Sequence, residues 1–147
     1  MRRIGILATV ASAFALMASA TPAHAGDLMT FYNMHTAKCL NGAPSLSKPV
    51  MSGCGANAHW DVTSDSRGTK FMVGAGIKCL DTNGTDVYLS PCSDADPGQW
   101  WNAYMDPSSV RGYIRWGDKY LTAWNDGSLS MARSSQVDQP SKYHWRW

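Results

Sequence analysis

The sequence repeats one pattern of residues three times, and this repeat limits the possible folds more than any other feature. A triplet centred on leucine recurs at offsets of 40 and 41 residues: Cys39-Leu40-Asn41, Cys79-Leu80-Asp81 and Tyr120-Leu121-Thr122. A tryptophan closes each copy, at offsets of 41 and 44 residues: Trp60, Trp101 and Trp145. Markers with nearly the same period predict three structural units, at about residues 26–66, 67–107 and 108–147.

Three units of ~40 residues favour a closed all-β fold. A period of ~40 residues also occurs in helical repeats and in β-propellers. No window shows the sustained i, i+3, i+4 apolar spacing of an amphipathic helix, and propellers have at least ~4 blades. A unit of a few short strands cannot bury its own apolar face, so three units around one axis must share a core. The repeated leucines and tryptophans are then predicted to be equivalent core positions.

The N-terminus has the three parts of a secretory signal peptide. Met1-Arg2-Arg3 is a positively charged start, residues 4–17 are small and apolar, and Ala23-His24-Ala25 fits the A-x-A pattern that signal peptidase cuts. A membrane anchor is the alternative, but a spanning helix needs ~20 strongly apolar residues. We therefore expect a signal peptide over residues 1–25, no membrane insertion, and a secreted chain of residues 26–147 that forms one domain.

The secreted chain is expected to carry balanced charge. The full sequence has 13 Lys and Arg against 11 acidic residues, and removal of Arg2 and Arg3 leaves 13 − 2 = 11 basic residues. A neutral domain does not indicate nucleic acid or an anionic membrane as a partner. Every acidic residue is Asp, and Gly, Asn, Ser and aromatic residues are plentiful. That mixture is typical of short strands joined by tight turns.

The four cysteines predict disulfides, because an even number in an exported chain usually forms pairs. Four cysteines allow three pairings. We favour Cys39–Cys54 and Cys79–Cys92, since each pair then lies within one repeat. A zinc site is the alternative, but the sequence has neither C-x-x-C nor H-x-x-x-H. We expect no metal and no cofactor.

The second unit carries the residues of a known signature. Cys79-Leu80-Asp81, Val87-Tyr88-Leu89, Cys92 and Gln99-Trp100-Trp101 resemble the C-L-D … V-x-L … C … Q-x-W pattern of ricin-B-type (Q-x-W) lectin domains. Val87-Tyr88 and Pro91-Cys92 are also similar to actinohivin-type lectins of actinomycetes. The resemblance extends over the secreted chain as three units. It implies a β-trefoil that binds galactose, mannose, xylan or related glycans, either alone or attached to a glycosidase or toxin.

Five residues are expected to bind carbohydrate: the resemblance implies this role for Asp81, Tyr88, Gln99 and Asn57, and the position of Trp124 suggests it for that ring, with packing at the rim as the alternative. In the family, the Asp after C-L accepts hydrogen bonds from sugar hydroxyls and an aromatic ring stacks under the sugar, and these roles fall to Asp81 and Tyr88. Gln99 supports the site. The Asn that precedes Q-x-W in the family is present only in the first unit, as Asn57. Trp124 lies near the turn of the third unit, where its ring can stack on a sugar. The other two units lack the Asp, so the second unit is the main expected site.

We expect a secreted lectin-like module that binds glycans without catalysis. The sequence contains no G-x-S-x-G, no H-E-x-x-H and no phosphate-binding glycine loop. Asp94 and Asp96 are closely spaced acids, but solvated turn residues are commoner than the paired carboxylates of a glycosidase. The alternative is a trefoil that binds protein, such as a protease inhibitor or a toxin accessory subunit, because a fold does not fix its ligand. A third hypothesis is a carbohydrate-binding module separated from an enzyme.

Overall fold

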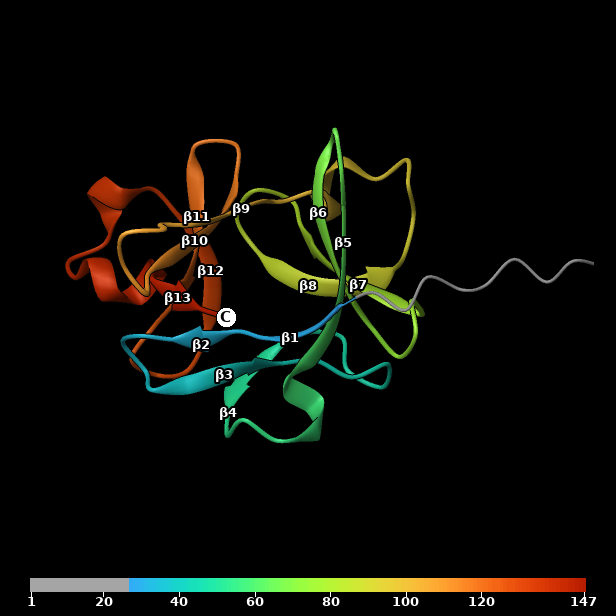
Figure 1. Cartoon of the computed structure of the whole chain (residues 1–147), viewed down its shortest axis with the longest axis horizontal. Helices are drawn as coiled ribbons and strands as arrows, with labels where there is room; N and C mark the ends of the chain where they lie inside the picture. The colour runs from blue at the N-terminus through green and yellow to red at the C-terminus, as the bar shows by residue number, and fades with distance from the viewer. Residues whose placement is uncertain (1–26) are drawn as a thin grey trace, which may run out of the picture.

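The computed structural model describes residues 27–147, so the expected signal peptide over residues 1–25 lies outside the described residues. The described chain forms short strands and single turns of 3₁₀ helix, and it contains no α-helix, which confirms the all-β prediction. Between residues 27 and 147, no helix is long and apolar enough to cross a membrane. Figure 1 shows the chain passing through three successive groups of strands, from cyan and green through yellow to orange and red.

The strands fall into three units, each with a first strand, a hairpin and a last strand, and in unit one the first strand is divided into β1 and β2. Unit one, residues 27–65, contains β1 (Asp27–Thr30), β2 (Tyr32–Asn33), β3 (Lys38–Asn41), β4 (Val50–Ser52), η1 (Ala56–Ala58) and β5 (His59–Asp65). Unit two, residues 68–105, contains β6 (Gly68–Val73), β7 (Lys78–Thr82), β8 (Val87–Pro91), η2 (Pro97–Gln99) and β9 (Asn102–Met105). Unit three, residues 112–146, contains β10 (Gly112–Trp116), β11 (Lys119–Ala123), β12 (Leu129–Ala132), η3 (Ser134–Gln136), η4 (Pro140–Tyr143) and β13 (Trp145–Arg146).

The first and last strands of the units close into one barrel. β1 pairs with β5, and β5 pairs with β6. The first and last strands of unit two meet at the bridge between Thr69 and Trp101, and β9 then pairs with β10. β10 pairs with β13, and β13 pairs with β2, which completes the ring. The middle strands of each unit form a hairpin attached to this ring: β3–β4, β7–β8 and β11–β12. A closed barrel with three hairpins is a β-trefoil, as the family resemblance implied.

The repeated leucines and tryptophans lie together in the core, as the repeat predicted. All six side chains are 0% exposed: Leu40, Leu80, Leu121, Trp60, Trp101 and Trp145. In each unit the indole Nε1 of the tryptophan donates a hydrogen bond to the backbone carbonyl of the leucine, at distances of 2.9, 3.0 and 2.9 Å. A buried indole N–H needs an acceptor, so this bond ties the last strand of each unit to its own hairpin.

Large side chains from the first strands fill the centre of the barrel. Phe31, Phe71 and Ile114 are almost completely buried. The rings of Phe31 and Phe71 meet edge to face with centroids 4.9 Å apart, and Trp147 packs against Phe31 at 5.5 Å. Complete burial of a side chain of this size stabilises a fold by ~1.5–3 kcal/mol. The core therefore draws on all three units.

Both predicted disulfides are present. Cys39 is bonded to Cys54 and Cys79 to Cys92, each with a Cα–Cα distance of 5.0 Å. Each bridge joins the first strand of a hairpin to the loop that follows the hairpin. The prediction of one disulfide within each of the first two repeats is confirmed.

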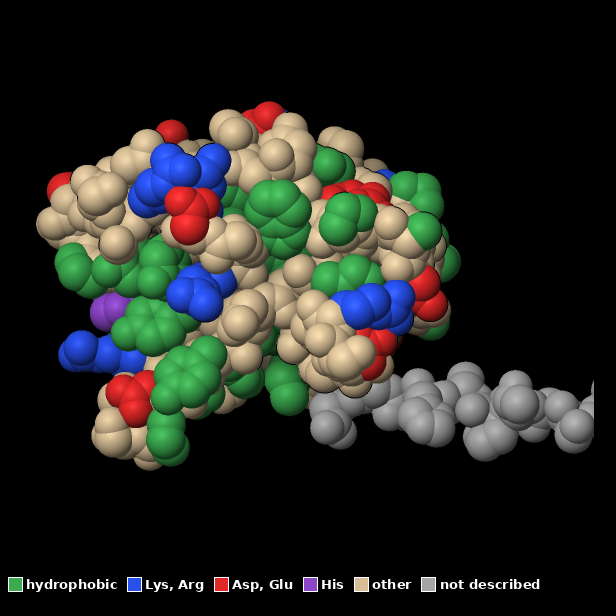
Figure 2. Space-filling view, turned by 90° about the horizontal axis from the view of Figure 1, so that it is seen from above, with side chains coloured by type: hydrophobic (Ala, Val, Ile, Leu, Met, Phe, Trp, Pro, Cys, Tyr) green, Lys and Arg blue, Asp and Glu red, His purple; other side chains and the backbone are tan. Residues whose placement is uncertain are grey.

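The surface carries charges of both signs. On the face shown in Figure 2, Lys and Arg side chains are interspersed with acidic ones among uncharged residues. Four ion pairs form among residues 27–147: Arg67–Asp65, Lys70–Asp94, Arg133–Asp118 and Lys142–Asp138. The lysines of two pairs, Lys70 and Lys142, are buried, whereas the two arginine pairs are exposed and contribute only ~0–1 kcal/mol each.

Candidate functional site

Three of the five expected sugar-binding residues come together in unit two. β7 carries Asp81, and β8 carries Tyr88 directly opposite Asp81 in the strand register. η2 ends on Gln99, whose side chain is completely buried beneath the loop that follows β8. We call Asp81, Tyr88, Ser90 and Gln99 the unit-two cluster.

A chain of hydrogen bonds holds the carboxylate of Asp81. The hydroxyl of Ser90 donates to Oδ2 of Asp81. The Nε2 of Gln99 donates to Oγ of Ser90 at 2.7 Å and to the carbonyl of Pro91 at 2.9 Å, and it lies 3.5 Å from the same Oδ2. The Oε1 of Gln99 accepts from the backbone N–H of Ser93 at 2.8 Å. Both ends of the Gln99 amide are therefore occupied, and Gln99 fixes the loop as well as the carboxylate.

Asp81 is itself buried, which the sequence did not reveal. The residue is only 2% exposed, and no group among residues 27–147 forms a hydrogen bond with its Oδ1. Gly98 lies directly over this oxygen. A Cβ at Gly98 would lie 2.4 Å from Oδ1 of Asp81 and 2.3 Å from the carbonyl oxygen of Thr82. A side chain larger than that of glycine would therefore clash with the backbone of Thr82 and the carboxylate of Asp81.

Tyr88 stands beside the carboxylate and is half-buried. Burial raises the pKa of the Tyr88 hydroxyl, and the negative charges of Asp81 and Asp96 raise it further. The hydroxyl therefore remains neutral and able to donate at neutral pH. A flat ring next to a carboxylate offers both groups that a sugar needs, an apolar surface for its C–H face and an acceptor for its hydroxyls.

Two tryptophans near η2 are already engaged within the protein. The ring of Trp100 lies 3.9 Å from Cζ of Arg67 and 4.2 Å from Nζ of Lys70. Trp116 comes from unit three, and its Nε1 donates to the carbonyl of Pro97 at 2.8 Å. Cation–π contacts and a hydrogen bond of this kind position the loop that contains η2. We therefore assign both rings to the support of the unit-two cluster.

Asn57 and Trp124 lie outside the unit-two cluster. Asn57 is in η1 of unit one, with an exposed side chain, and its backbone carbonyl accepts from the N–H of Gly42 at 2.9 Å. Trp124 follows β11 of unit three, and its Nε1 donates to Oγ of Ser130 at 2.8 Å. The Nζ of Lys142 lies 5.2 Å from its ring centre. Neither residue adds to the site around Asp81, and each remains a prediction for its own unit.

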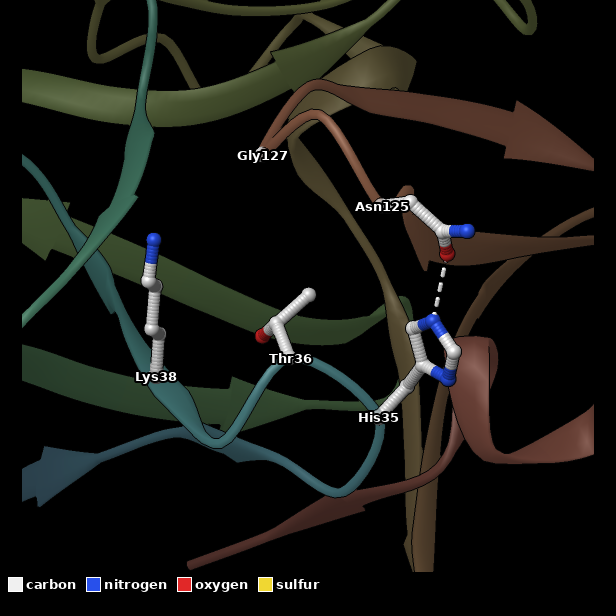
Figure 3. A pocket seen from close by; sticks show the side chains of 5 residues that line it. All are labelled: His35, Thr36, Lys38, Asn125 and Gly127. Carbon is white, nitrogen blue, oxygen red and sulfur yellow. Dashed lines mark hydrogen bonds between the residues drawn. The ribbon is translucent and has the colours of Figure 1, made fainter.

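A polar hollow of ≈ 270 Å³ lies where the β2–β3 turn of unit one meets the β11–β12 turn of unit three (Figure 3). It is lined by His35, Thr36, Lys38, Asn125 and Gly127. Figure 3 shows His35 and Asn125 pointing toward each other, and their Nε2 and Oδ1 atoms are 2.5 Å apart. Thr36 donates its hydroxyl to Oδ1 of Asn33 at 3.2 Å. Most polar groups of the hollow are therefore satisfied within the protein, which makes it the weaker candidate for a ligand.

A second hollow, which the sequence interpretation missed, lies on the outer face of β9, β10 and β11. It is a groove of ≈ 470 Å³ lined by Asn102, Tyr104, Tyr113, Arg115 and Tyr120. We call it the tyrosine groove. On β10 the residues alternate, with the buried Ile114 between the groove residues Tyr113 and Arg115, whereas β11 ends in three consecutive buried residues and does not alternate. The lectin signature drew attention to unit two instead.

The described side chains offer non-covalent binding chemistry. Among residues 27–147, no three His, Cys, Asp or Glu side chains gather where they could hold a metal ion. The unit-two cluster supplies a carboxylate, an amide and a phenol, and the tyrosine groove supplies ring faces, an amide and a guanidinium. These groups bind neutral or anionic polar ligands that also have an apolar face.

Comparison with known proteins shows the fold and no closer relationship. No family model matches the sequence, and no curated protein matches it. The designed threefold-symmetric protein ThreeFoil is 19% identical, with a TM-score of 0.64 over 81% of this chain and 96% of that chain. The ricin B-like lectin MPL of Macrolepiota procera, in complex with lactose, is 11% identical, with a TM-score of 0.63 over 86% of this chain and 97% of that chain.

A toxin chain shares the same architecture. A chain of the Haemophilus ducreyi cytolethal distending toxin is 12% identical, with a TM-score of 0.65 over 86% of this chain and 85% of that chain. The protein is therefore a β-trefoil whose structural neighbours include a ricin B-like lectin and a toxin chain.

Proposed function

We propose that the protein is a secreted module that binds glycans without catalysis, and that the unit-two cluster is its main site. The observation that carries this proposal is the unpartnered Oδ1 of Asp81 beside the ring of Tyr88. Native proteins leave few buried polar atoms without a partner, and an unsatisfied carboxylate oxygen is a strong acceptor. A sugar hydroxyl is a donor of the right size to satisfy it.

Access to Oδ1 requires a small movement of η2. Gly98 covers the oxygen with backbone atoms alone, so no side chain has to leave. The hydrogen bonds of Gln99 and the Cys79–Cys92 bridge hold both ends of this loop. We expect the movement at Asp96, Pro97 and Gly98, and it must break the hydrogen bond from Trp116 to the carbonyl of Pro97. A bound sugar then donates a hydroxyl to Oδ1 while its C–H face packs on Tyr88.

The proposed contacts give a weak single site. A hydrogen bond to a charged acceptor contributes ~1.5–3 kcal/mol, and the contact with one ring adds ~1 kcal/mol. Their sum of ~2.5–4 kcal/mol corresponds to a dissociation constant of about 1–15 mM. Stable binding to a surface that carries many glycans then requires more than one binding site per molecule.

Two further observations support the proposal. The fold is shared with MPL, which was solved in complex with lactose, so a glycan is a ligand class known for this architecture. The two disulfides are typical of proteins in oxidising compartments, which supports secretion. N-terminal sequencing of the protein recovered outside the cell should begin at Gly26. Recovery of a chain that still begins at Met1 contradicts secretion by signal-peptide cleavage.

A glycan array probed with oxidised protein of residues 26–147 tests the proposal. We expect binding to a defined set of glycans, and we expect Tyr88→Ala to reduce the signal at least ~5-fold through loss of the ring contact. Val50→Ala is the matched control, because Val50 lies opposite Asn41 in unit one as Tyr88 lies opposite Asp81 in unit two, and Val50 is 44% exposed. No binding by the wild-type protein, or equal loss in the two variants, contradicts the proposal.

Protein binding is the second candidate function. It is favoured by the likeness to a chain of the cytolethal distending toxin and by two strongly exposed apolar side chains, Leu28 at 67% and Ile77 at 61%. A protein ligand, such as a protease or a toxin subunit, would dock through surface loops rather than through the buried carboxylate of Asp81. This candidate is supported if the protein binds no glycan on the array but inhibits a protease in a panel of proteases.

A further inference from the structure

The tyrosine groove is built by the register of three neighbouring strands. On β10, Tyr113 and Arg115 are two residues apart and therefore point to the same face of the sheet. Arg115 lies opposite Asn102 of β9 on one side and opposite Tyr120 of β11 on the other. Tyr113 lies opposite Tyr104 of β9. Figure 1 shows these three strands side by side in the orange part of the chain.

Two of the three tyrosine rings of the groove, Tyr113 and Tyr120, are held in place by other aromatic side chains. Tyr120 stacks on Tyr143 with centroids 4.8 Å apart and an interplanar angle of 30°. Tyr113 meets Tyr120 at 5.8 Å and His144 at 5.2 Å. Side chains that are fixed before a ligand arrives lose little conformational entropy on binding. The groove is therefore a preorganised surface for a ligand with an apolar face.

The polar groups of the groove have no partner within the described chain. Arg67 and Arg133 each form an ion pair with an aspartate. Arg115 forms neither an ion pair nor a hydrogen bond among residues 27–147, and its Cζ lies 5.8 Å from the ring centre of Tyr120. The side-chain amide of Asn102 is likewise unbonded within those residues and is exposed. A guanidinium and an amide that converge on one hollow are free to bind a ligand.

We infer that the tyrosine groove binds a sugar residue that carries a carboxylate, such as a uronic acid. Arg115 binds the carboxylate through two parallel N–H donors, a geometry that a planar guanidinium is suited to form. The face of Tyr113 or Tyr104 packs against the ring C–H groups, and Asn102 bonds a hydroxyl. The inference rests on the proposed glycan-binding function and adds a second site with a different preference from that of the unit-two cluster.

Local charge supports an anionic ligand. Asp118 is the acidic residue nearest to Arg115 in sequence, and its carboxylate is bonded to Arg133. The Arg115 charge is therefore not neutralised from that side. Because the carboxylate is bound by one half-buried cation at the surface of the groove, added salt should weaken binding of the acidic sugar and leave neutral sugars unaffected.

Titration of one matched pair of sugars tests the inference. Methyl β-glucuronide and methyl β-glucoside differ only in the carboxylate at C6, and their affinities for residues 26–147 can be measured by NMR. We expect the glucuronide to bind at least ~10-fold more tightly, with its shifts on β9, β10 and β11. Arg115→Gln should abolish this preference. Arg115→Lys should retain part of it, because a lysine keeps the charge but lacks the two parallel N–H donors of the guanidinium.

Arg111→Gln is the matched control, since Arg111 is an exposed arginine immediately before β10 that does not line the groove. Equal affinities for the two sugars, or equal effects of Arg111→Gln and Arg115→Gln, overturn the inference. If neutral glycans bind on the array but the glucuronide shows no preference, the inference fails and the unit-two site stands. If only the glucuronide binds, through Arg115, the groove stands and the unit-two site fails.

Discussion

Units two and three place different residues at the position before the buried leucine. In unit two this residue is Cys79, and it forms a disulfide with Cys92. In unit three the residue is Tyr120, and it stacks on Tyr143. At the same place in the repeat, unit two therefore has a disulfide and unit three has a cluster of aromatic rings.

The two arrangements stabilise the fold in different ways. A disulfide acts mainly by restricting the unfolded chain, whereas packed rings act in the folded state. The fold accepts either because the hydrogen bond from tryptophan to leucine recurs in both units, through Trp101 and Trp145. The hydrogen bond from tryptophan to leucine is therefore common to both units, whereas the residues of the outer layer differ between them.

The outer layers also offer different binding chemistry. Unit two encloses a carboxylate, Asp81, beneath Gly98. Unit three has Thr122 at the same place in the repeat, and its hydroxyl donates to the carbonyl of Tyr120 at 3.0 Å. The rings that replace the disulfide form one wall of an open groove that contains Arg115. Loss of a crosslink thus accompanies the appearance of a second candidate site.

Removal of the unit-two disulfide should have the largest effect. The bridge closes a loop with a sequence separation of 13, so Cys79→Ser with Cys92→Ser should lower the free energy of unfolding by about 3 kcal/mol. Urea denaturation monitored by tryptophan fluorescence measures this change. The paired replacement of Cys39 and Cys54 is the control and should give a similar loss. A loss below about 1 kcal/mol in the first variant contradicts the comparison.

Removal of the central ring of unit three should have the next largest effect. Tyr120→Ala deletes a half-buried ring that contacts both Tyr113 and Tyr143, and we expect a loss of about 2 kcal/mol. Tyr104→Ala is the control, because Tyr104 is 53% exposed, and it should change stability by less than about 0.5 kcal/mol. Equal effects of the two variants in thermal melting would show that the ring cluster does not stabilise unit three.

Asp81→Ala should destabilise unit two by about 1–2 kcal/mol, because the hydroxyl of Ser90 and the amide of Gln99 lose their shared acceptor. Thr122→Ala, at the same place in unit three, removes one hydrogen bond to a backbone carbonyl and should lower stability by less than about 1 kcal/mol. Chemical denaturation of both variants checks the difference. A larger loss from Thr122→Ala would mean that the carboxylate network adds little to the fold.

Much of the fold could be predicted from the sequence. The positions of Leu80 and Trp101 in the repeat predicted the shared core, and the placement of cysteines within the repeat predicted both disulfides. These features depend on residue type and on spacing along the sequence, and both can be known without the conformation of the loops. The all-β class followed from the absence of helical periodicity.

The site was less accessible to sequence reasoning. The signature brought Asp81, Tyr88 and Gln99 together correctly, but it could not show that Gly98 lies on the carboxylate, because burial depends on how η2 packs. The tyrosine groove depends on the register between β9 and β10, which are separated by a loop. Strand register is a tertiary property, so the alternation on β10 alone did not mark Arg115 as part of a site.

Acidification should have the smallest effect. Burial lowers the pKa of His144 below its usual 6.5, and the positive charge of Arg111 lowers it further. The unfolded chain then binds the proton more readily, so stability falls as the pH drops below about 6.5 and stops falling below the folded pKa. His144→Gln should flatten this part of the pH profile in thermal melts between pH 7 and pH 5. An unchanged profile would exclude His144 as the titrating group.

An NMR titration tests most directly whether the unit-two cluster and the tyrosine groove, which lies between units two and three, bind different ligands. Labelled protein of residues 26–147 would be titrated with a neutral glycan selected on the array and, separately, with methyl β-glucuronide. We predict that the neutral glycan shifts residues of β7, β8 and η2, whereas the glucuronide shifts residues of β9, β10 and β11. Shifts confined to the hollow between His35 and Asn125, or the same shifts for both ligands, would contradict the account.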